Sequence, residues 1–174
     1  MKLPRIVVAA SLGLAALVSA PVNACSCPEG PETPFLDFAS TAPLVVRGQV
    51  ISVQARASKR HPPVMSLRVL EVLVGSHPGN RITVAGDVGA DCWHSVNAFP
   101  VGSEWVLALD RVPRTASQAP LLVVPRCVES RLPVEDGAVM GSLELTAAGT
   151  IATESTTLED LRRRLRSRIS RVAR

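Results

Sequence analysis

The chain has 174 residues, of which 19 are basic and 15 are acidic, for a formal net charge of +4. Seven of the arginines lie in the last 17 residues, so the positive charge is confined to a tail. With aromatic residues making up only 3% of the chain, the composition excludes a basic, aromatic-rich face for a nucleic-acid partner.

The first 24 residues are typical of a secretory signal peptide. Lys2 and Arg5 precede an apolar run over residues 6–18, and small residues follow. The run is shorter than the roughly 20 residues of a membrane-spanning helix, so we expect a secreted or periplasmic protein. Cleavage after Ala24 would leave Cys25 as the first residue. Lipoprotein processing also needs a cysteine there, so a lipid-anchored envelope protein is the alternative.

The four cysteines are Cys25, Cys27, Cys92 and Cys127. An even number in an exported chain favours disulfides. A zinc site is the competing interpretation, but zinc ligands usually form two close pairs and only the first pair is close here. A ring closed between Cys25 and Cys27 would be strained. Each therefore pairs with a distant cysteine, which leaves two connectivities open and ties the amino terminus to the body of the protein.

The elements are predicted in chain order from proline, glycine and β-branched residues. Residues 28–34 are proline-rich and should be extended, and residues 35–40 form a helical turn. Alternating or β-branched runs then predict five strands, at residues 44–54, 64–75, 81–86, 103–110 and 119–127. Five short strands with no long helix between them favour a small closed barrel of the oligonucleotide/oligosaccharide-binding type. A two-sheet sandwich fits the periodicity nearly as well.

The last 18 residues, 157–174, predict an amphipathic helix. Thr157 is a candidate N-cap, with Asp160 three residues further on. A stripe of apolar residues at helical spacing would face the barrel, with arginines opposite: Leu158, Leu161, Leu165, Ile169 and Val172. The arginine face would be solvated or would contact an anionic membrane surface. The expected organisation is a signal peptide at 1–24, a barrel at 25–135, a linker or extension at 136–156 and this helix.

A family resemblance rests on several of these segments together. They are the C-x-C at the mature start, LVVRGQV, SLRVLEVLVG followed by ITV, a mid-chain cysteine, VGSEWVLALD, and a cysteine after the last strand. Over about residues 25–130 the chain resembles the netrin-like module of tissue inhibitors of metalloproteinases and their bacterial relatives. The resemblance implies a five-stranded barrel of the type above. With the carboxy-terminal helix predicted from the apolar stripe, the expected fold class is all-β with a flanking helix. The resemblance also implies the disulfides Cys25–Cys92 and Cys27–Cys127.

The resemblance further implies a non-catalytic inhibitor whose partner is a zinc metalloproteinase. The free amine and the carbonyl of Cys25 would chelate the protease's zinc, and this would be the chain's only contact with a metal. Ser26 would enter the specificity pocket, and Cys27, Pro28, Ala90 and Asp91 would widen the contact. We expect no catalytic residue and no cofactor. The animal inhibitors have a further disulfide and a carboxy-terminal domain with no counterpart here. A disulfide that only stabilises the barrel is the plainer interpretation.

Four residues are interpreted as structural. Cys92, Trp93 and His94 stand together, but a disulfide-bonded Cys92 cannot act as a nucleophile, so we expect no catalytic role there. Trp93 and Trp105 are expected in the core, because the chain has few other aromatic side chains.

Overall fold

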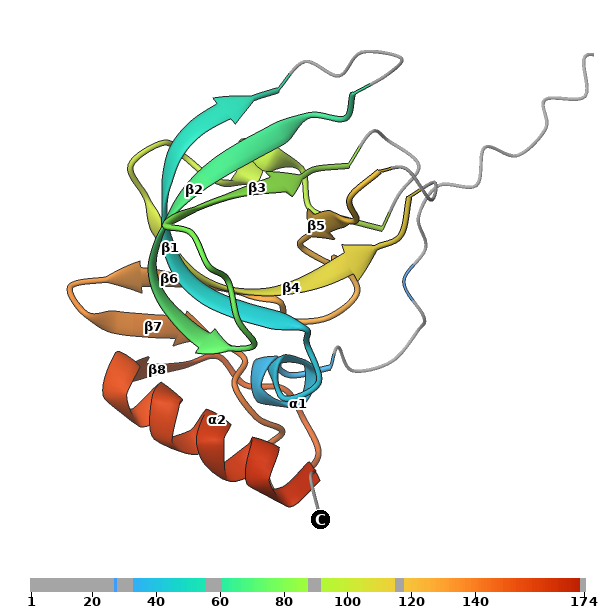
Figure 1. Ribbon diagram of the computed structural model, residues 1–174. Coiled ribbons are helices and arrows are strands. Elements are labelled where there is room, and N and C mark those ends of the chain that lie inside the picture. The colour runs from blue at the N-terminus through green and yellow to red at the C-terminus, as the bar shows by residue number, and fades with distance from the viewer. Residues whose placement is uncertain (1–26, 28–32, 56–60, 88–91, 115–117, 173–174) are drawn as a thin grey trace, which may run out of the picture.

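Five strands close into a barrel (Figure 1). The computed structural model describes residue 27 and residues 33–55, 61–87, 92–114 and 118–172. The barrel strands are β1 (Leu44–Gln54), β2 (Val64–Val74), β3 (Arg81–Ala85), β4 (Glu104–Val112) and β5 (Leu121–Val123). Closure is complete because β1 pairs with both β2 and β4, and β3 pairs in parallel with β5. This confirms the predicted barrel and excludes the sandwich.

The barrel interior is filled by alternate residues of its strands. On β4, Leu107 and Leu109 point inward, and they are fully buried. Trp105 lies on the same face, as the alternation predicts, and packs at the edge of this core. The short 3-10 helix η1 (Val96–Ala98), with Phe99 after it, closes one end of the barrel, since Val96 and Phe99 are also buried in this core. The fifth predicted strand is real but short, because only three of its nine residues, Leu121–Val123, form the barrel strand β5.

Three strands were missing from the sequence prediction. They are β6 (Arg131–Glu135), β7 (Ala138–Gly141) and β8 (Glu154–Thr157). β6 pairs with the first half of β4, and β7 and β8 follow in order. Residues 136–156, expected as a linker or extension, therefore contain β7 and most of β8. They extend the sheet beyond the barrel.

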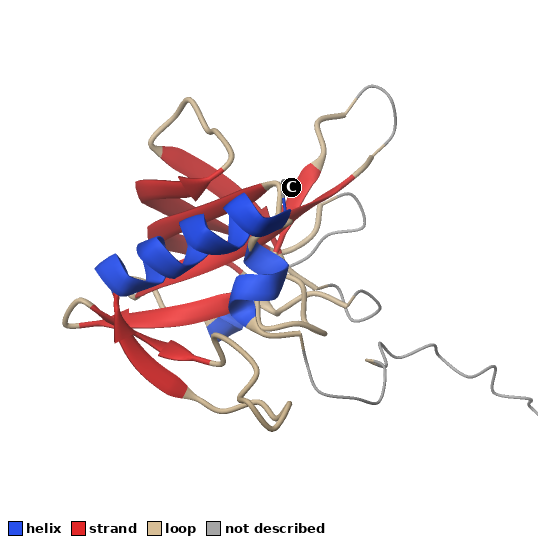
Figure 2. Cartoon of the chain, turned by 90° about the horizontal axis from the view of Figure 1, so that it is seen from below, coloured by secondary structure: helices blue, strands red, loops and turns tan. Residues whose placement is uncertain are grey.

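The helices cover the outer face of this sheet. α1 (Phe35–Ala39) and α2 (Leu158–Val172) lie together against the strands in both views (Figures 1 and 2). They bury a second core with the outward residues of β4, Val106 and Ala108, and with Leu132 of β6 and Val139 of β7. Both faces of β4 are therefore buried. Two separate cores share the strands β1 and β4.

The carboxy-terminal helix begins and packs as predicted. The backbone N–H of Asp160 donates to the hydroxyl of Thr157 at 3.2 Å, which is an N-cap hydrogen bond. Leu161 and Leu165 of the predicted stripe are buried, whereas Val172 is exposed. Among the described residues, no helix is both long enough and apolar enough to cross a membrane.

Candidate functional site

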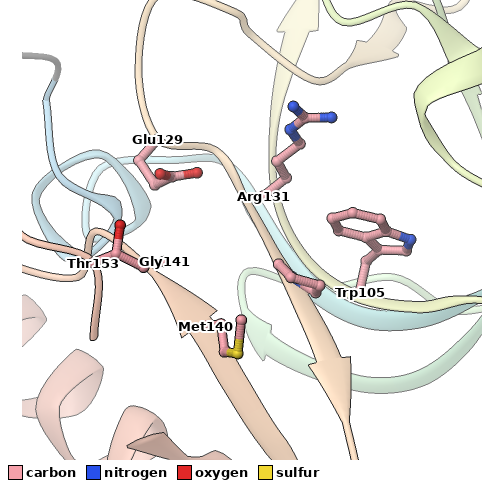
Figure 3. A pocket seen from close by; sticks show the side chains of 7 residues that line it. Trp105, Glu129, Arg131, Met140, Gly141 and Thr153 are labelled. Carbon is pink, nitrogen blue, oxygen red and sulfur yellow. The ribbon is translucent and has the colours of Figure 1, made fainter. Parts of the chain in front are cut away.

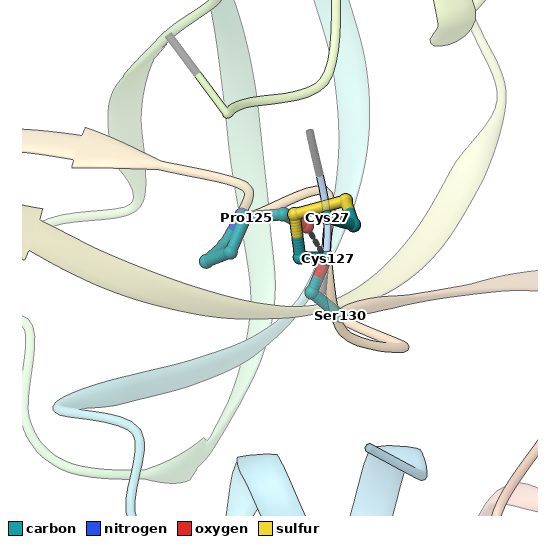
Figure 4. The surroundings of a disulfide bond; sticks show 4 residues. All are labelled: Cys27, Pro125, Cys127 and Ser130. Atoms are coloured by element: carbon teal, nitrogen blue, oxygen red, sulfur yellow. Dashed lines mark hydrogen bonds between the residues drawn. A yellow bond between two sulfur atoms is a disulfide. The ribbon is translucent and has the colours of Figure 1, made fainter. Parts of the chain in front are cut away.

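One disulfide fixes the described start of the chain to the barrel. Cys27 is bonded to Cys127, which follows β5, with the two Cα atoms 5.2 Å apart (Figure 4). This confirms the Cys27–Cys127 pairing. The loop that carries Cys127 is itself held in place, because the buried hydroxyl of Ser130 donates to the carbonyl of Pro125 at 2.5 Å. Residue 27 is thus attached to a rigid part of the fold.

A second segment runs beside this loop. The backbone N–H of His94 donates to the carbonyl of Val124 at 2.8 Å, and that of Arg126 donates to the carbonyl of Cys92 at 2.9 Å. Residues 92–94 and 124–126 therefore form a short antiparallel pair, with Trp93 opposite Pro125. This pairing brings Cys92 and Cys127 to the same end of the barrel.

Most of the site expected from the sequence lies outside the described residues. Five of its six residues fall there: Cys25, Ser26, Pro28, Ala90 and Asp91. Cys27 alone is described, and it is exposed next to its disulfide partner. Cys92 is disulfide-bonded, but the predicted pair Cys25–Cys92 involves a residue outside the described part of the chain.

A cluster of an arginine and three rings lies close to the disulfide loop. The guanidinium carbon of Arg131 on β6 lies over the rings of Phe99 and Trp105, at 5.7 and 6.0 Å from their centroids. Phe99 meets Trp105 edge to face at 5.2 Å and His94 edge to face at 6.3 Å. The indole N–H of Trp105 donates to Ser103 at 2.7 Å. These contacts fix the position of the guanidinium.

The electrostatic field of this cluster is positive. Burial, then the charges of Arg131 and Arg126, lower the pKa of His94 from 6.5 to about 4. The imidazole is therefore neutral at pH 7. A neutral imidazole carries no charge that would attract an anion, but its N–H group can donate a hydrogen bond to an anion held by the two arginines.

Two hollows open on either side of Arg131. The arginine pocket, of about 290 Å³, is lined by residues that include Asp87, Trp93, His94, Ser95, Arg126 and Arg131. The methionine groove, of about 340 Å³, is lined by Trp105, Glu129, Arg131, Pro133, Met140, Gly141 and Thr153. Figure 3 shows Trp105 and Arg131 on one side of this groove and Glu129 and Thr153 on the other. Hollows of this size are at the lower end for small ligands.

The arrangement can bind a ligand that carries both an anionic and an apolar group. Among the described residues, no group of three or more His, Cys, Asp or Glu side chains could hold a metal ion. A guanidinium with planar donors and an adjacent apolar groove can instead hold a carboxylate next to an apolar group.

Sequence reasoning missed most of this cluster. Trp105 was expected in the core, yet it is only half-buried and lines the groove. Arg131 carried no signal, because the strand that positions it was not predicted. The triplet Cys92, Trp93 and His94 was noticed, but as a structural feature only.

Neither a scan against protein-family models nor a search of curated proteins finds a match for this chain. The netrin-like family therefore stays a hypothesis drawn from the cysteine spacing and the strand motifs.

Proposed function

We propose that the chain is an exported, non-catalytic binding module of the netrin-like type that inhibits a zinc metalloproteinase through its mature amino terminus. The observation that carries this proposal is the Cys27–Cys127 disulfide, which attaches the chain to the barrel two residues after Cys25. A terminus held in this way loses little conformational entropy when it binds, and this favours affinity.

The chemistry of the proposed contact lies in the first mature residue. A free terminal amine has a pKa of roughly 7.7 to 8.0 and loses its proton more readily on a metal. The amine and the carbonyl oxygen of Cys25 would together chelate the protease's zinc and displace its water. The side chain of Ser26 would enter the specificity pocket. Acylation of the same amine would abolish this ligand, so inhibition and lipidation exclude each other.

The barrel end offers a scaffold for such a contact. The segment at 92–94 and the loop at 124–127 lie side by side next to Cys27. Partner surfaces of this kind are commonly built from loops on a rigid scaffold. Cys27, Pro28, Ala90 and Asp91 would contribute the rest of the surface around the terminus.

Mass spectrometry of the mature protein is the first test. A free Cys25 amine is expected, and a diacylglyceryl adduct would support the alternative, a lipid-anchored envelope protein. An uncleaved leader would contradict both proposals.

A comparison of inhibition is the second test. Protein with a free Cys25 is compared with the same protein carrying one additional alanine before Cys25, on a panel of zinc metalloproteinases. The extension moves the terminal amine away from the zinc, so the inhibition constant is expected to rise at least about a hundredfold. Disulfide mapping of both proteins controls for misfolding. Equal inhibition by the two forms would exclude chelation by the terminus.

A further inference from the structure

Arg131 differs from the other half-buried arginines of the described residues in having no carboxylate partner. Each of the others forms an ion pair: Arg47 with Glu104, Arg162 with Glu71, Arg164 with Glu154, and Arg168 with Asp37. None of the ion pairs between described residues includes Arg131. Its guanidinium is partly removed from water, yet its charge is not neutralised. Such a group has a strong tendency to bind an anion.

The rings beside Arg131 hold its guanidinium in place without occupying its hydrogen-bond donors. Both rings lie within about 6 Å of its guanidinium carbon and attract its charge. No hydrogen bond between described residues uses an N–H group of the Arg131 side chain. Two of these N–H groups can bind a carboxylate in a bidentate geometry.

A second arginine adds to the positive field. Arg126 lines the same arginine pocket and is exposed, and none of the ion pairs between described residues includes it. Both arginines depress the pKa of His94. Asp87 and Glu129 also line the two hollows and have interactions of their own. No ion pair between described residues joins either carboxylate to these arginines.

The methionine groove continues the surface on the other side of Arg131. Trp105 and Pro133 are paired across β4 and β6, and Met140 on β7 is 46% exposed. The groove is therefore walled by apolar side chains on three adjacent strands. One arginine thus borders both a positive pocket and an apolar groove.

We propose that Arg131 and Arg126 bind the terminal carboxylate of a peptide whose last side chain is apolar and occupies the methionine groove. The last residue of a peptide carries its terminal carboxylate and its side chain on the same Cα. This matches the arrangement of the arginine pocket and the methionine groove, which meet at Arg131. The charge complementarity selects the carboxylate, and the groove selects the apolar side chain. This site uses none of the amino-terminal residues, so it stands independently of protease inhibition.

Short peptides test the proposal directly. The probes are N-acetyl-Ala-Leu with a free carboxylate, its carboxamide, and N-acetyl-Ala-Gly with a free carboxylate. Binding is followed by NMR at the Trp105 indole N–H and the His94 ring. The free Leu acid is expected to give saturable shifts and to raise the pKa of His94 from about 4, because its charge offsets that of the arginines. The carboxamide and the Gly peptide should each bind about tenfold more weakly.

Matched variants locate the site. Arg131→Gln and Arg126→Gln are each expected to weaken binding of the Leu acid by about tenfold or more. Arg126 is exposed, so its variant separates loss of binding from loss of folding, which thermal unfolding checks. Arg166→Gln, at an exposed arginine of α2, is the control and should bind normally.

Four outcomes would overturn the proposal. These are equal binding of acid and carboxamide, unchanged binding by both arginine variants, inorganic phosphate binding as tightly as the Leu acid, or a dimer in sedimentation that Arg131→Gln abolishes. The third would indicate a simple anion site, and the fourth would assign the surface to a second copy of the chain. The expected result is a monomer that binds the free Leu acid best and loses this binding in both variants.

Discussion

Gly75 and Gly102 both have backbone angles that favour glycine, with φ of 78° and 90°. They differ in their surroundings. A Cβ on Gly75 would lie 2.3 Å from the carbonyl oxygen of Pro43, whereas one on Gly102 would meet nothing within 4 Å. Gly75 thus lets the end of β2 approach the chain just before β1.

Alanine substitutions should separate these two effects. Gly102→Ala should cost about 1 kcal/mol of unfolding free energy, from backbone strain alone. Gly75→Ala should cost about 3 kcal/mol, because the Pro43 carbonyl must also move. Urea denaturation of both variants measures the difference. Equal losses of unfolding free energy in the two variants would show that the end of β2 and Pro43 can move apart without a cost in free energy.

His94 should make the stability of the protein depend on pH. Its folded-state pKa is about 4, below the ordinary value of 6.5. Between these values the unfolded chain binds a proton that the folded imidazole does not, so stability falls as pH falls through this window. The full linkage corresponds to about 3 kcal/mol. Because the ring is only partly buried, solvent screening reduces the expectation to about 1 kcal/mol.

The comparison with His94→Gln isolates this contribution. Carboxylates titrate in the same range, but they do so in both proteins. The stability of the wild type relative to the variant should therefore decrease by about 1 kcal/mol between pH 7.5 and 4.5. A constant difference across this range would mean that His94 is protonated in the folded state as easily as in the unfolded chain.

At the scale of elements, α2 is attached to the barrel by charge as well as by its apolar stripe. Arg162 donates two hydrogen bonds to Glu71 on β2, at 2.6 and 2.7 Å. Arg168 pairs with Asp37 on α1. Several arginines of this face therefore contact the protein's own carboxylates. This favours docking on the barrel over contact with a membrane surface.

A double-mutant cycle on Glu71 and Arg162 measures this attachment. With Glu71→Gln and Arg162→Met, the coupling free energy should be about 1 kcal/mol at low salt and less than half of that at 1 M NaCl. The pair Arg163 and Asp160 is the control, because Arg163 is 78% exposed, and it should show no measurable coupling. Equal coupling free energies in the two pairs would mean that the two hydrogen bonds between Arg162 and Glu71 add nothing to stability.

The sequence predicted the barrel strands well and the extension poorly. β1 to β4 carry long alternating or β-branched runs, and their predicted bounds agree closely with the structure. β6 and β7 are short, and Pro133 within β6 argues against a strand. The one local signal was Asp136-Gly137, where both residues have positive φ, as a two-residue hairpin turn requires. Arg131 could be placed in a site only after this hairpin was known.

Local structure could be predicted from the sequence, but contacts between distant residues could not. Thr157 and the apolar stripe determine α2 locally, so the sequence was enough to predict this helix. The position of Arg131 over Phe99 and Trp105 joins residues more than 25 positions apart, and no periodicity encodes it. The pairing of Cys27 with Cys127 was one of two open connectivities, and only the family resemblance chose between them.

At the scale of the whole molecule, two cores are built on opposite faces of the same strands. Leu107 and Leu109 of β4 belong to the barrel core, while Val106 and Ala108 belong to the core under the helices. If β4 separates from one core, the side chains that it buries in the other core are exposed to solvent as well. We therefore expect one cooperative unfolding transition, with near-ultraviolet and far-ultraviolet circular dichroism changing together. Separate transitions would show that the helices detach before the barrel opens.

The Cys27–Cys127 disulfide should contribute to this stability through the unfolded chain. It joins residues 100 positions apart, and closing a loop of that length is worth about 5 kcal/mol in the chain-entropy model. The double variant Cys27→Ser with Cys127→Ser should lose about this much in urea denaturation. The native strands pair without the bridge, so the remaining fold should keep its circular dichroism spectrum. A loss below about 1 kcal/mol would mean that other contacts already restrict this end of the unfolded chain. The bridge would then serve only to position residue 27.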